Sequence, residues 1–458
     1  MFDKKRNLDE LNRAQLIDLV ELLLARVATL EKQVARLKST ESKQVAKTSQ
    51  NSSVPPSQDQ KANKPASAPA KRGPKHGHVG KSRERMIPDE IVECRVVCCQ
   101  RCGMDLSEQP QWVVGRHQVI DLPPIQPVVR EAWRYRTTCP QCKSQQTAPY
   151  GPGFERGRTF GPHLERLVLY LHYAHPLSYE RVQRILRELY GLKISQGALV
   201  NRVKGTEKSL HRAAEGIHRQ LKQAAVIGSD ETGARVDGAK FWQWVFQTPH
   251  LAYYVLRPSR AAQVIDEVMG EAQPAVWVSD VFSAQMCHPA RDYQICLAHQ
   301  VRDLQYAIDN HECTWAQQAQ TLLHLAMRFQ RQRDCLDAAA FERQRLAYEA
   351  QLDDLLAQSP DNTDSEMLRG RFLKHRQAIF FFLQRADVPP TNNASEQALR
   401  NSVIYRKVTG GFRSEWGAHL YANLISILET TRRQERPLFE TLAAILQDQP
   451  VFAPPHFA

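Results

Sequence analysis

The chain has 458 residues and a formal net charge of +12 at pH 7. That length allows several domains, and the positive charge favours an acidic partner, of which nucleic acid is the usual one. No apolar run reaches the roughly 18 uncharged residues of a membrane span, and the charged start lacks a signal-peptide core. We therefore expect a cytoplasmic protein with no membrane partner, whose ten cysteines serve as metal ligands or free thiols.

Residues 8–38 carry a heptad pattern in which leucines and valines each recur every seven residues. Valine at one core position and leucine at the other favour a parallel two-stranded coiled coil, so we predict a dimerisation helix. The alternative is a single amphipathic helix packed on its own chain. The pattern consists of Leu16, Leu23, Leu30 and Leu37, with Val20, Val27 and Val34 between them.

Residues 39–90 are rich in Ser, Pro, Lys, Gln and Ala and poor in large apolar side chains. Such a composition buries too little surface to order itself, so we predict a flexible basic linker. Its basic cluster at residues 71–76 could contact phosphates, or it could simply be solvated.

Residues 91–150 contain two Cys-x-x-Cys pairs, which predict a zinc-binding ribbon. Four thiolates bind zinc tetrahedrally, and the two-residue spacing lets one turn present two sulfurs. Cys98 could replace Cys99 with a different spacing. The predicted ligands are Cys99, Cys102, Cys139 and Cys142.

Between these cysteine pairs, residues 130–136 are typical of a strand. Alternation would place Arg130, Arg134 and Arg136 on one face, with Trp133 and Tyr135 on the other. A basic face suits a phosphate backbone, although a purely structural ribbon would show the same pattern.

Residues 155–222 are predicted to be helical. Ser178 and Ser195 are placed to begin two helices, and Gly191 to end the first of them. Two short helices joined by a glycine-containing turn fit a DNA-binding helix-turn-helix, and a plain helical bundle explains the pattern equally well.

From residue 223 the pattern changes to strands. Four β-rich runs separated by turn residues predict a mixed sheet with helices packed on it, over residues 223–295. A helical insertion at 296–390 and further helices at 391–447, interrupted by Gly410–Gly411 and Gly417, follow. The predicted strands are Ala224–Asp230, Phe241–Thr248, Leu251–Leu256 and Ala275–Asp280.

Three acidic residues stand out in this part of the chain. Asp230 and Asp280 each end an apolar run that would reach one edge of the sheet, where open α/β sheets place their sites, and Glu396 lies in the first turn of a helix. Such a set supplies the oxygen ligands of a two-metal phosphoryl-transfer site. Asp230 could instead lie in a solvated turn, and Glu396 could form a capping box with Asn393.

Further candidates flank these acids. Arg400, Arg406 and Lys407 follow Glu396 and could hold a substrate backbone. Cys296 and His299 would be neighbours on a helix, where they could bind a metal or support the site. The alternative for this pair is a buried thiol and a helix-facing imidazole.

This order of parts resembles the transposases of the insertion sequence 66 family, the TnpC-like proteins. The resemblance covers nearly the whole chain, and its most specific part is the run Asn392–Arg400 around Glu396. The segment Val281–Ala284 departs from the family, in which a Gly-Tyr stretch is expected. The other matching segments are the heptads, Gln50–Ser57, the two Cys-x-x-Cys pairs, Ser229–Thr232 and Cys296–His299.

The resemblance implies a multidomain α+β chain with an RNase H-like mixed α/β core and a DDE triad at Asp230, Asp280 and Glu396. It implies two Mg²⁺ (or Mn²⁺) ions at the triad and Zn²⁺ at the ribbon. The implied activity cleaves element ends at terminal inverted repeats and joins the 3′-hydroxyl to target DNA. Double-stranded DNA and a homodimer or higher oligomer in a synaptic complex are the implied partners, and accessory proteins are left open. The alternatives are a catalytically inactive zinc-ribbon DNA-binding regulator and an RNase H-like nuclease.

Overall fold

The computed structural model of the chain describes residues 45–52, 84–123, 125–154 and 159–452, with the isolated residues 23, 26, 27, 30, 73 and 80. Within the predicted coiled coil, Leu23, Arg26, Val27 and Leu30 are helical and exposed. The remainder of 8–38, and most of the predicted linker with its basic cluster, lie outside the described residues.

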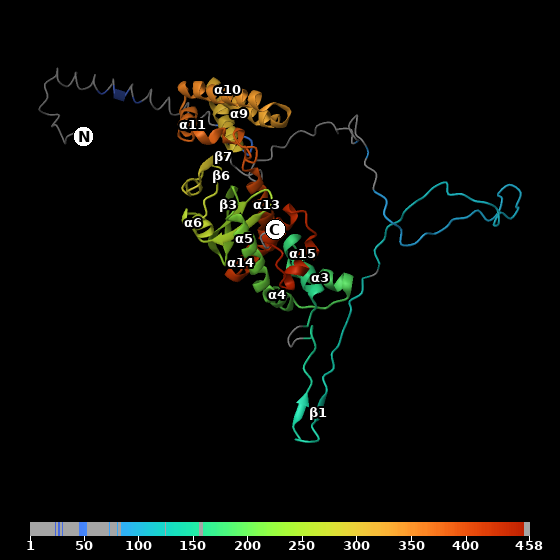
Figure 1. Ribbon diagram of the computed structural model, residues 1–458. Coiled ribbons are helices and arrows are strands. Elements are labelled where there is room, and N and C mark those ends of the chain that lie inside the picture. Colours follow the sequence, from blue (N-terminus) through green and yellow to red (C-terminus); the bar gives the residue numbers. More distant parts are fainter. Residues whose placement is uncertain are drawn as a thin grey trace, which may run out of the picture.

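We call residues 159–452 the packed part. A five-stranded mixed sheet forms its centre, in the order β5-β4-β3-β6-β7 (Figure 1). Strands β3 (Val226–Val236), β4 (Ala239–Gln247) and β5 (Ala252–Arg257) form an antiparallel meander. Strands β6 (Val276–Ser279) and β7 (Asp292–Ile295) continue the sheet in parallel with β3. The four predicted strands are therefore confirmed, and β7 is an addition.

Strand β3 does not end at Asp230, as the apolar run had indicated. It continues to Val236 and turns into β4 through Asp237 and Gly238, which both have positive φ. The turn holds a hairpin register that pairs every residue from Gly228 to Val236 with β4, so the polar residues after Asp230 remain in the sheet. Asp230 consequently lies within a strand and not in a solvated turn.

The helices before the sheet begin and end largely as predicted. They are α2 (Pro162–Leu169), which continues through a π-helical turn (Tyr170–Ala174), α3 (Tyr179–Tyr190), α4 (Gln196–Gly205) and α5 (Glu207–Leu221). The Ser178 and Ser195 hydroxyls accept hydrogen bonds from the N–H groups of Arg181 and Ala198, and Gly191 ends α3 with φ of 66°.

One hydrophobic core joins these helices to the sheet and to the C-terminal helices α13 (Asn393–Thr409), α14 (Glu415–Arg433) and α15 (Leu438–Leu446). Helix α14 packs on β5 and α5, and α13 packs on β3 and β4. Gly410 and Gly411 separate α13 from α14 as predicted. Gly417, by contrast, lies inside α14, because its N–H donates to the Ser414 hydroxyl that caps the helix.

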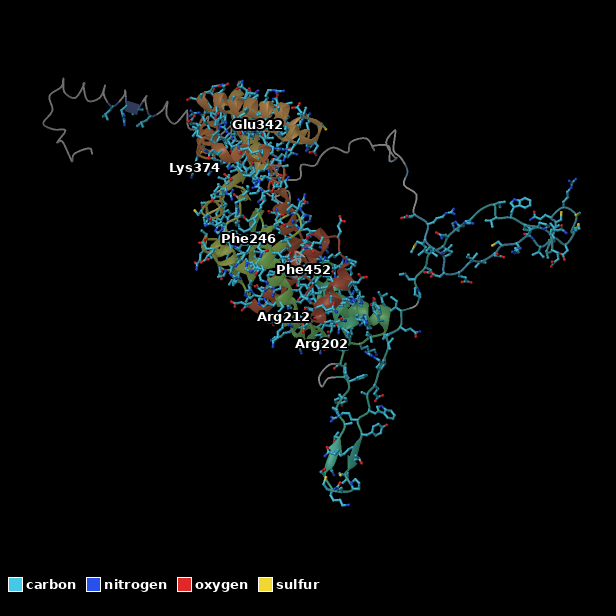
Figure 2. The ribbon with its side chains drawn as sticks, viewed as in Figure 1. Arg202, Arg212, Phe246, Glu342, Lys374 and Phe452 are labelled. Atoms are coloured by element: carbon cyan, nitrogen blue, oxygen red, sulfur yellow. The ribbon has the colours of Figure 1, made fainter. Side chains whose placement is uncertain are left out.

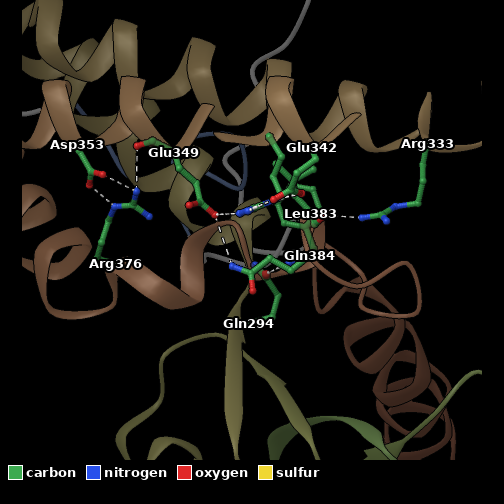
Figure 3. Close-up of polar contacts among 10 residues, drawn as sticks. Gln294, Arg333, Glu342, Glu349, Asp353, Arg376, Leu383 and Gln384 are labelled. Atoms are coloured by element: carbon green, nitrogen blue, oxygen red, sulfur yellow. Dashed lines mark hydrogen bonds and ion pairs between the residues drawn. The ribbon is translucent and has the colours of Figure 1, made fainter. Parts of the chain in front are cut away.

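A second core lies within the helical stretch after β7, where the insertion was predicted. The helices are α8 (Leu297–His311), α9 (Thr314–Gln330), α10 (Ala338–Ala357), α11 (Thr363–Lys374) and the short α12 (Arg376–Ile379). Gln294 of β7 ties this part to the sheet, since it accepts from the Phe382 N–H and donates to the Ile379 carbonyl. Arg376 pairs with Asp353 across α12 and α10 (Figure 3).

Residues 84–154 form an arm that contributes to neither core. The arm runs out from the packed part in two long excursions, and the hairpin of β1 (Arg136–Thr138) and β2 (Gln145–Thr147) lies at the end of the second (Figure 1). The strand predicted over 130–136 therefore begins only at Arg136. No helix in the described part of the chain is long and apolar enough to cross a membrane.

Candidate active site

The two predicted aspartates emerge side by side from neighbouring parallel strands. The last residues that β3 and β6 pair are Gly228 and Val278, and Asp230 and Asp280 each lie two residues further along. Adjacent strands are about 4.8 Å apart, and residues two apart point to the same face, so the two carboxylates become neighbours. That face of β3 meets helix α13, because the space above Gly228 is filled by Asn392 and Ser395.

The electrostatics of Asp230 reflect this crowding. Burial, followed by the negative charges of Asp280 and Glu231, raises the pKa of the Asp230 carboxyl well above its ordinary value, and the charge of Glu396 adds to the effect. The Glu231 N–H, which donates to Asp230 Oδ1 over 2.8 Å, opposes the rise in pKa only in part. Neither Asp230 nor Asp280 forms an ion pair with any described cation. Within the described residues, the two aspartates therefore lack a compensating cation.

Glu396 is the third acid of this cluster, and its side chain contacts two basic side chains of α8. Its Oε1 lies 3.2 Å from Arg302 Nη2 and 3.5 Å from His299 Nε2, and both partners project from α8. The capping-box interpretation of Glu396 is wrong, since Asn392 is the N-cap of α13 and Asn393 is its first helical residue. Sequence analysis missed Arg302; its spacing of three from His299, on a helix, was the available signal.

Asn392 links the segments that carry these groups. Its buried side chain donates from Nδ2 to the Ser229 carbonyl over 2.6 Å and accepts from the Ser395 hydroxyl over 2.7 Å. Its backbone N–H lies 3.1 Å from Cys296 Sγ. Because Ser229 precedes Asp230 and Ser395 precedes Glu396, one residue fixes α13 against β3 at the level of the acids.

Gln247 and Gly228 extend this network, which we call the Asn392 network. Gln247 Nε2 donates to the Ser395 hydroxyl over 3.2 Å, and its Oε1 accepts from Arg433 over 2.7 Å. A Cβ atom at Gly228 would lie 2.5 Å from Gln247 Nε2 and 2.9 Å from Asn392 Oδ1. Only glycine leaves room for the network on this face of β3.

Glu231, next to Asp230, is a fourth acid that the sequence analysis did not select. It is buried, and burial raises its pKa although Arg260 lies 2.6 Å away. Gln285 donates to its second oxygen over 2.7 Å. With both oxygens occupied, Glu231 holds the segment after Asp280 against β3.

The segment after Asp280 has an unusual backbone. Val281 has a φ of 73°, in the left-handed region that β-branched residues avoid. The next N–H, of Phe282, donates to Asp280 Oδ1 over 3.2 Å. The family's expected glycine would adopt this φ freely, so the departure noted in the sequence coincides with backbone strain beside a predicted ligand.

The remaining candidates near α13 divide into three kinds. Arg400 and Lys407 are exposed. Arg406 is instead tied to the sheet, because it donates to Gln243 Oε1 over 2.9 Å and to the Thr232 hydroxyl over 3.4 Å. Cys296 is buried, which raises the pKa of its thiol, and among the described residues His299 Nδ1 has no hydrogen-bond partner.

The four predicted zinc ligands lie in two turns that share the same backbone hydrogen-bond pattern. In each turn the first cysteine's N–H donates to the carbonyl five residues on, and its carbonyl accepts from the N–H four residues on. The residue at that fourth position, Gly103 or Lys143, has positive φ. Backbone hydrogen bonds from Arg101 and Cys102 lower the pKa of Cys99, and hydrogen bonds with Ser144 lower that of Cys142 to about 7.

The two turns do not come together. The first belongs to residues 84–123 and the second joins β1 to β2, and these segments lie at the ends of different excursions (Figure 1). Across the described residues, no group of three or more His, Cys, Asp or Glu side chains is arranged to hold an ion. The described residues therefore do not bring the four predicted ligands together, and the zinc site stays a prediction.

The three predicted arginines of the arm lie beside aromatic or polar neighbours. Arg130 lies over the Phe154 ring at 5.8 Å and Arg134 over the Tyr150 ring at 4.7 Å. Arg136 donates to the Thr147 hydroxyl over 3.0 Å. All three remain exposed, so their positive charges face solvent.

Residues 157–420, which hold this sheet, the helical insertion and all three acids, match the model of a family of transposases. The family is the transposase IS66 family, and because the match spans more than half of the chain, the protein belongs to it. The resemblance stated from the sequence is thereby confirmed. The search of curated proteins found no match for the chain.

Proposed function

We propose that this transposase is a DDE enzyme whose catalytic carboxylates are Asp230, Asp280 and Glu396. The observation that carries the proposal is the position of Asp230 and Asp280 at equal levels on adjacent parallel strands, facing α13. The strand order also supports an RNase H-like core, in which three antiparallel strands are followed by two parallel ones on the other side of the first.

The acids fit divalent cations such as Mg²⁺ or Mn²⁺, which prefer oxygen ligands. Asp230 and Asp280 have no cationic partner among the described residues, and burial followed by the neighbouring Asp280 charge raises the pKa of Asp230; these are the observations in favour of this fit. When bound, such ions stabilise the charge that develops on the attacking and leaving oxygens of a phosphodiester. Glu396 would complete the ligand set after exchanging its contacts with Arg302 and His299.

The surrounding residues supply position and charge. The Asn392 network holds Glu396 at the level of the aspartates. Arg302, freed from Glu396, would be placed to contact a DNA phosphate, and Arg400 and Lys407 would continue this basic surface along α13. Such positioning accounts for a large part of the barrier reduction in phosphoryl transfer.

The arm and the N-terminal helix have supporting roles in this proposal. Each cysteine turn already presents two sulfurs with at least one lowered thiol pKa, which suits Zn²⁺. With Zn²⁺ bound to Cys99, Cys102, Cys139 and Cys142, the ribbon and the α3–α4 pair would read the terminal inverted repeats. Residues 8–38 would pair two copies in the synaptic complex.

Cleavage and strand transfer on DNA that carries the element's ends test the proposal. Asp230→Asn, Asp280→Asn and Glu396→Gln should each lower both rates by about a thousandfold or more, since each removes a ligand charge while keeping the side-chain shape. DNA binding should be unchanged. Glu271→Gln, which neutralises an exposed acid away from the site, is the matched control. Cleavage without joining would indicate a nuclease, and full activity of any one variant would remove that residue from the site.

A further inference from the structure

Residues 45–52 lie within the predicted flexible linker, yet they are packed against helix α8. This helix belongs to the packed residues 159–452, which carry the proposed active site and are called the catalytic part below. Asn51 is only 3% exposed and Ser52 only 7%. A solvated linker would leave such polar side chains in water, since burying them costs free energy unless their hydrogen bonds are replaced. The segment therefore has a specific place on the protein.

Asn51 explains how this segment holds its shape. Its Oδ1 accepts from the Thr48 N–H over 2.7 Å and from the Thr48 hydroxyl over 3.2 Å. Its Nδ2 donates to the Ala46 carbonyl over 3.3 Å and to Asp309 Oδ2 over 3.1 Å. The amide thus uses both donors and both acceptor positions, a satisfaction that no other side chain at this position would reproduce.

The surface that receives the segment is the C-terminal half of α8. Besides Asp309, it includes Asn310, whose Oδ1 accepts from the Val45 N–H over 2.8 Å. It also includes Tyr306, with Lys47 Nζ 5.1 Å from the centre of its ring. A backbone contact from Val45, a charged contact from Lys47 and an amide contact from Asn51 all reach α8, so this is a specific contact and not a chance one.

We propose that residues 45–52 are a docking segment that fastens the N-terminal helix to α8 and so sets how far apart two catalytic parts can lie. The spacing role rests on the proposed pairing of residues 8–38. Seven peptide steps separate residue 38 from residue 45, so each docked catalytic part stays within about 25 Å of the paired helices. Without docking, the next described residues that join the catalytic part begin at residue 159, and the same limit would be about 400 Å.

The short tether has a consequence for the active site. Helix α8 carries His299 and Arg302, the partners of Glu396, near its start and the docking surface near its end. His299 and Asn310 are eleven residues apart, or about 16 Å along a helix. Docking in both copies of a dimer would therefore keep the two active sites close together, which raises the effective concentration of one site near the other. A complex that holds two DNA ends requires such proximity.

Hydrogen exchange on the full-length protein tests the contact. The Val45 and Thr48 amides, both hydrogen-bonded, should exchange at least about tenfold more slowly than an unfolded segment. Asn51→Asp, which places a carboxylate against Asp309, and Asp309→Ala, which alters only the receiving surface, should abolish this protection. Gln50→Ala changes an exposed side chain of the same segment and should leave it intact. Exchange in β4 and α14 serves as the check that the fold persists.

Unprotected Val45 and Thr48 amides in the wild-type protein, or unchanged protection in both contact variants, would overturn the docking segment. Small-angle scattering then tests the spacing role: Asn51→Asp should increase the maximum dimension of the dimer, and an unchanged dimension overturns that role. A monomeric wild-type protein would also overturn the spacing role, and with it the proposed coiled coil, while the exchange result would stand. Because neither measurement requires catalysis, failure of the DDE proposal would be seen separately.

Discussion

Large apolar side chains are buried in the packed part, residues 159–452, and exposed in the arm, residues 84–154. In the packed part Trp244, Phe246 and Trp277 are fully buried. In the arm Trp112 is 80% exposed and Val129 89% exposed. Figure 2 shows the same contrast, with side chains crowded around Phe246 and projecting singly from the arm.

The difference lies in long-range partners and not in composition. Five paired strands and the helices on them give each apolar residue of the packed part a neighbour from another segment. The arm's described strands are three residues each, too short to hold a hydrophobic face together. Burial stabilises by roughly 25 cal/mol per Å², so the arm gains little until another surface or ion brings its segments together.

The largest predicted effect is on the order of the arm, and it depends on bound zinc. If Zn²⁺ joins the two cysteine turns, the holoprotein's arm should be ordered, and Cys139→Ser should disorder it, because zinc binding supplies roughly 10 kcal/mol in small zinc modules. We expect hydrogen exchange over residues 84–154 to accelerate by a hundredfold or more and bound zinc to be lost. Exchange in the sheet should stay the same.

Cys335→Ser is the control, since it replaces an exposed thiol of the packed part. Equal loss of zinc in that variant would contradict the assignment. Unfolding of the sheet in Cys139→Ser would show that the two parts are not independent.

The next effect sharpens the contrast inside the packed part. Gly228→Ala places a Cβ into the Asn392 network and should destabilise the protein by about 2 kcal/mol, the cost of overpacking a filled site. Asn392→Ala should cost a similar amount because it strands the Ser229 carbonyl and the Ser395 hydroxyl. Thermal unfolding measures both.

A role in positioning Glu396 predicts more than lost stability. At temperatures where these variants are folded, the cleavage rate constant should fall by at least about tenfold while DNA affinity is unchanged. Gly233→Ala, on the same strand with open space above it, should change neither quantity. Equal losses of stability without a loss in rate would reduce the network to a structural role.

Local sequence rules predicted the elements whose causes are local. The helix starts at Ser178 and Ser195 and the helix end at Gly191 follow from capping chemistry, and four of the five strands of the central sheet follow from β-rich runs. Strand β7 escaped notice because Asp-Tyr-Gln-Ile has no such run, and its place follows from parallel pairing with β6.

Contacts between distant segments could not be predicted in this way. Arg302 meets Glu396 across 94 positions of sequence, so no spacing rule reveals the pair. The capping-box pattern at Asn393 and Glu396 failed because the helix begins one residue earlier, with Asn392 as its N-cap, and Glu396 instead contacts α8. Asn51 lies in a composition typical of linkers, and only its fit to Asp309 distinguishes it.

A smaller effect concerns the buried carboxylate of Asp230 and its influence on the free energy of unfolding. Asp230→Asn should raise the free energy of unfolding by about 1 to 2 kcal/mol at pH 8 without divalent ions, since it removes a buried charge facing other acids. The raised folded-state pKa of Asp230 means that its ionisation opposes folding, so the wild-type protein loses stability as pH rises through that pKa. The advantage of the variant should shrink as the pH falls.

Denaturant titrations across pH, with Glu271→Gln as the exposed control, measure this difference. Mg²⁺ or Mn²⁺ should stabilise the wild-type protein and have a weaker effect on Asp230→Asn, because an ion that binds only the folded state adds stability by mass action. A variant less stable than the wild type at pH 8 would contradict the charge argument.

The smallest effect concerns the backbone at Val281, a β-branched residue of the packed part that has a positive φ. A left-handed conformation costs a β-branched residue about 1 to 2 kcal/mol, and glycine forfeits about 0.5 to 1 kcal/mol of chain entropy, so Val281→Gly should stabilise the protein by up to about 1 kcal/mol. Asp237→Gly is the matched comparison: its φ is also positive, at 47°, but aspartate tolerates this region, so the gain should be near zero. A gain at Val281 with unchanged cleavage would mean that the strain is incidental. A gain accompanied by slower cleavage would mean that the strained turn, through the Phe282 N–H, holds the Asp280 carboxylate where the reaction needs it.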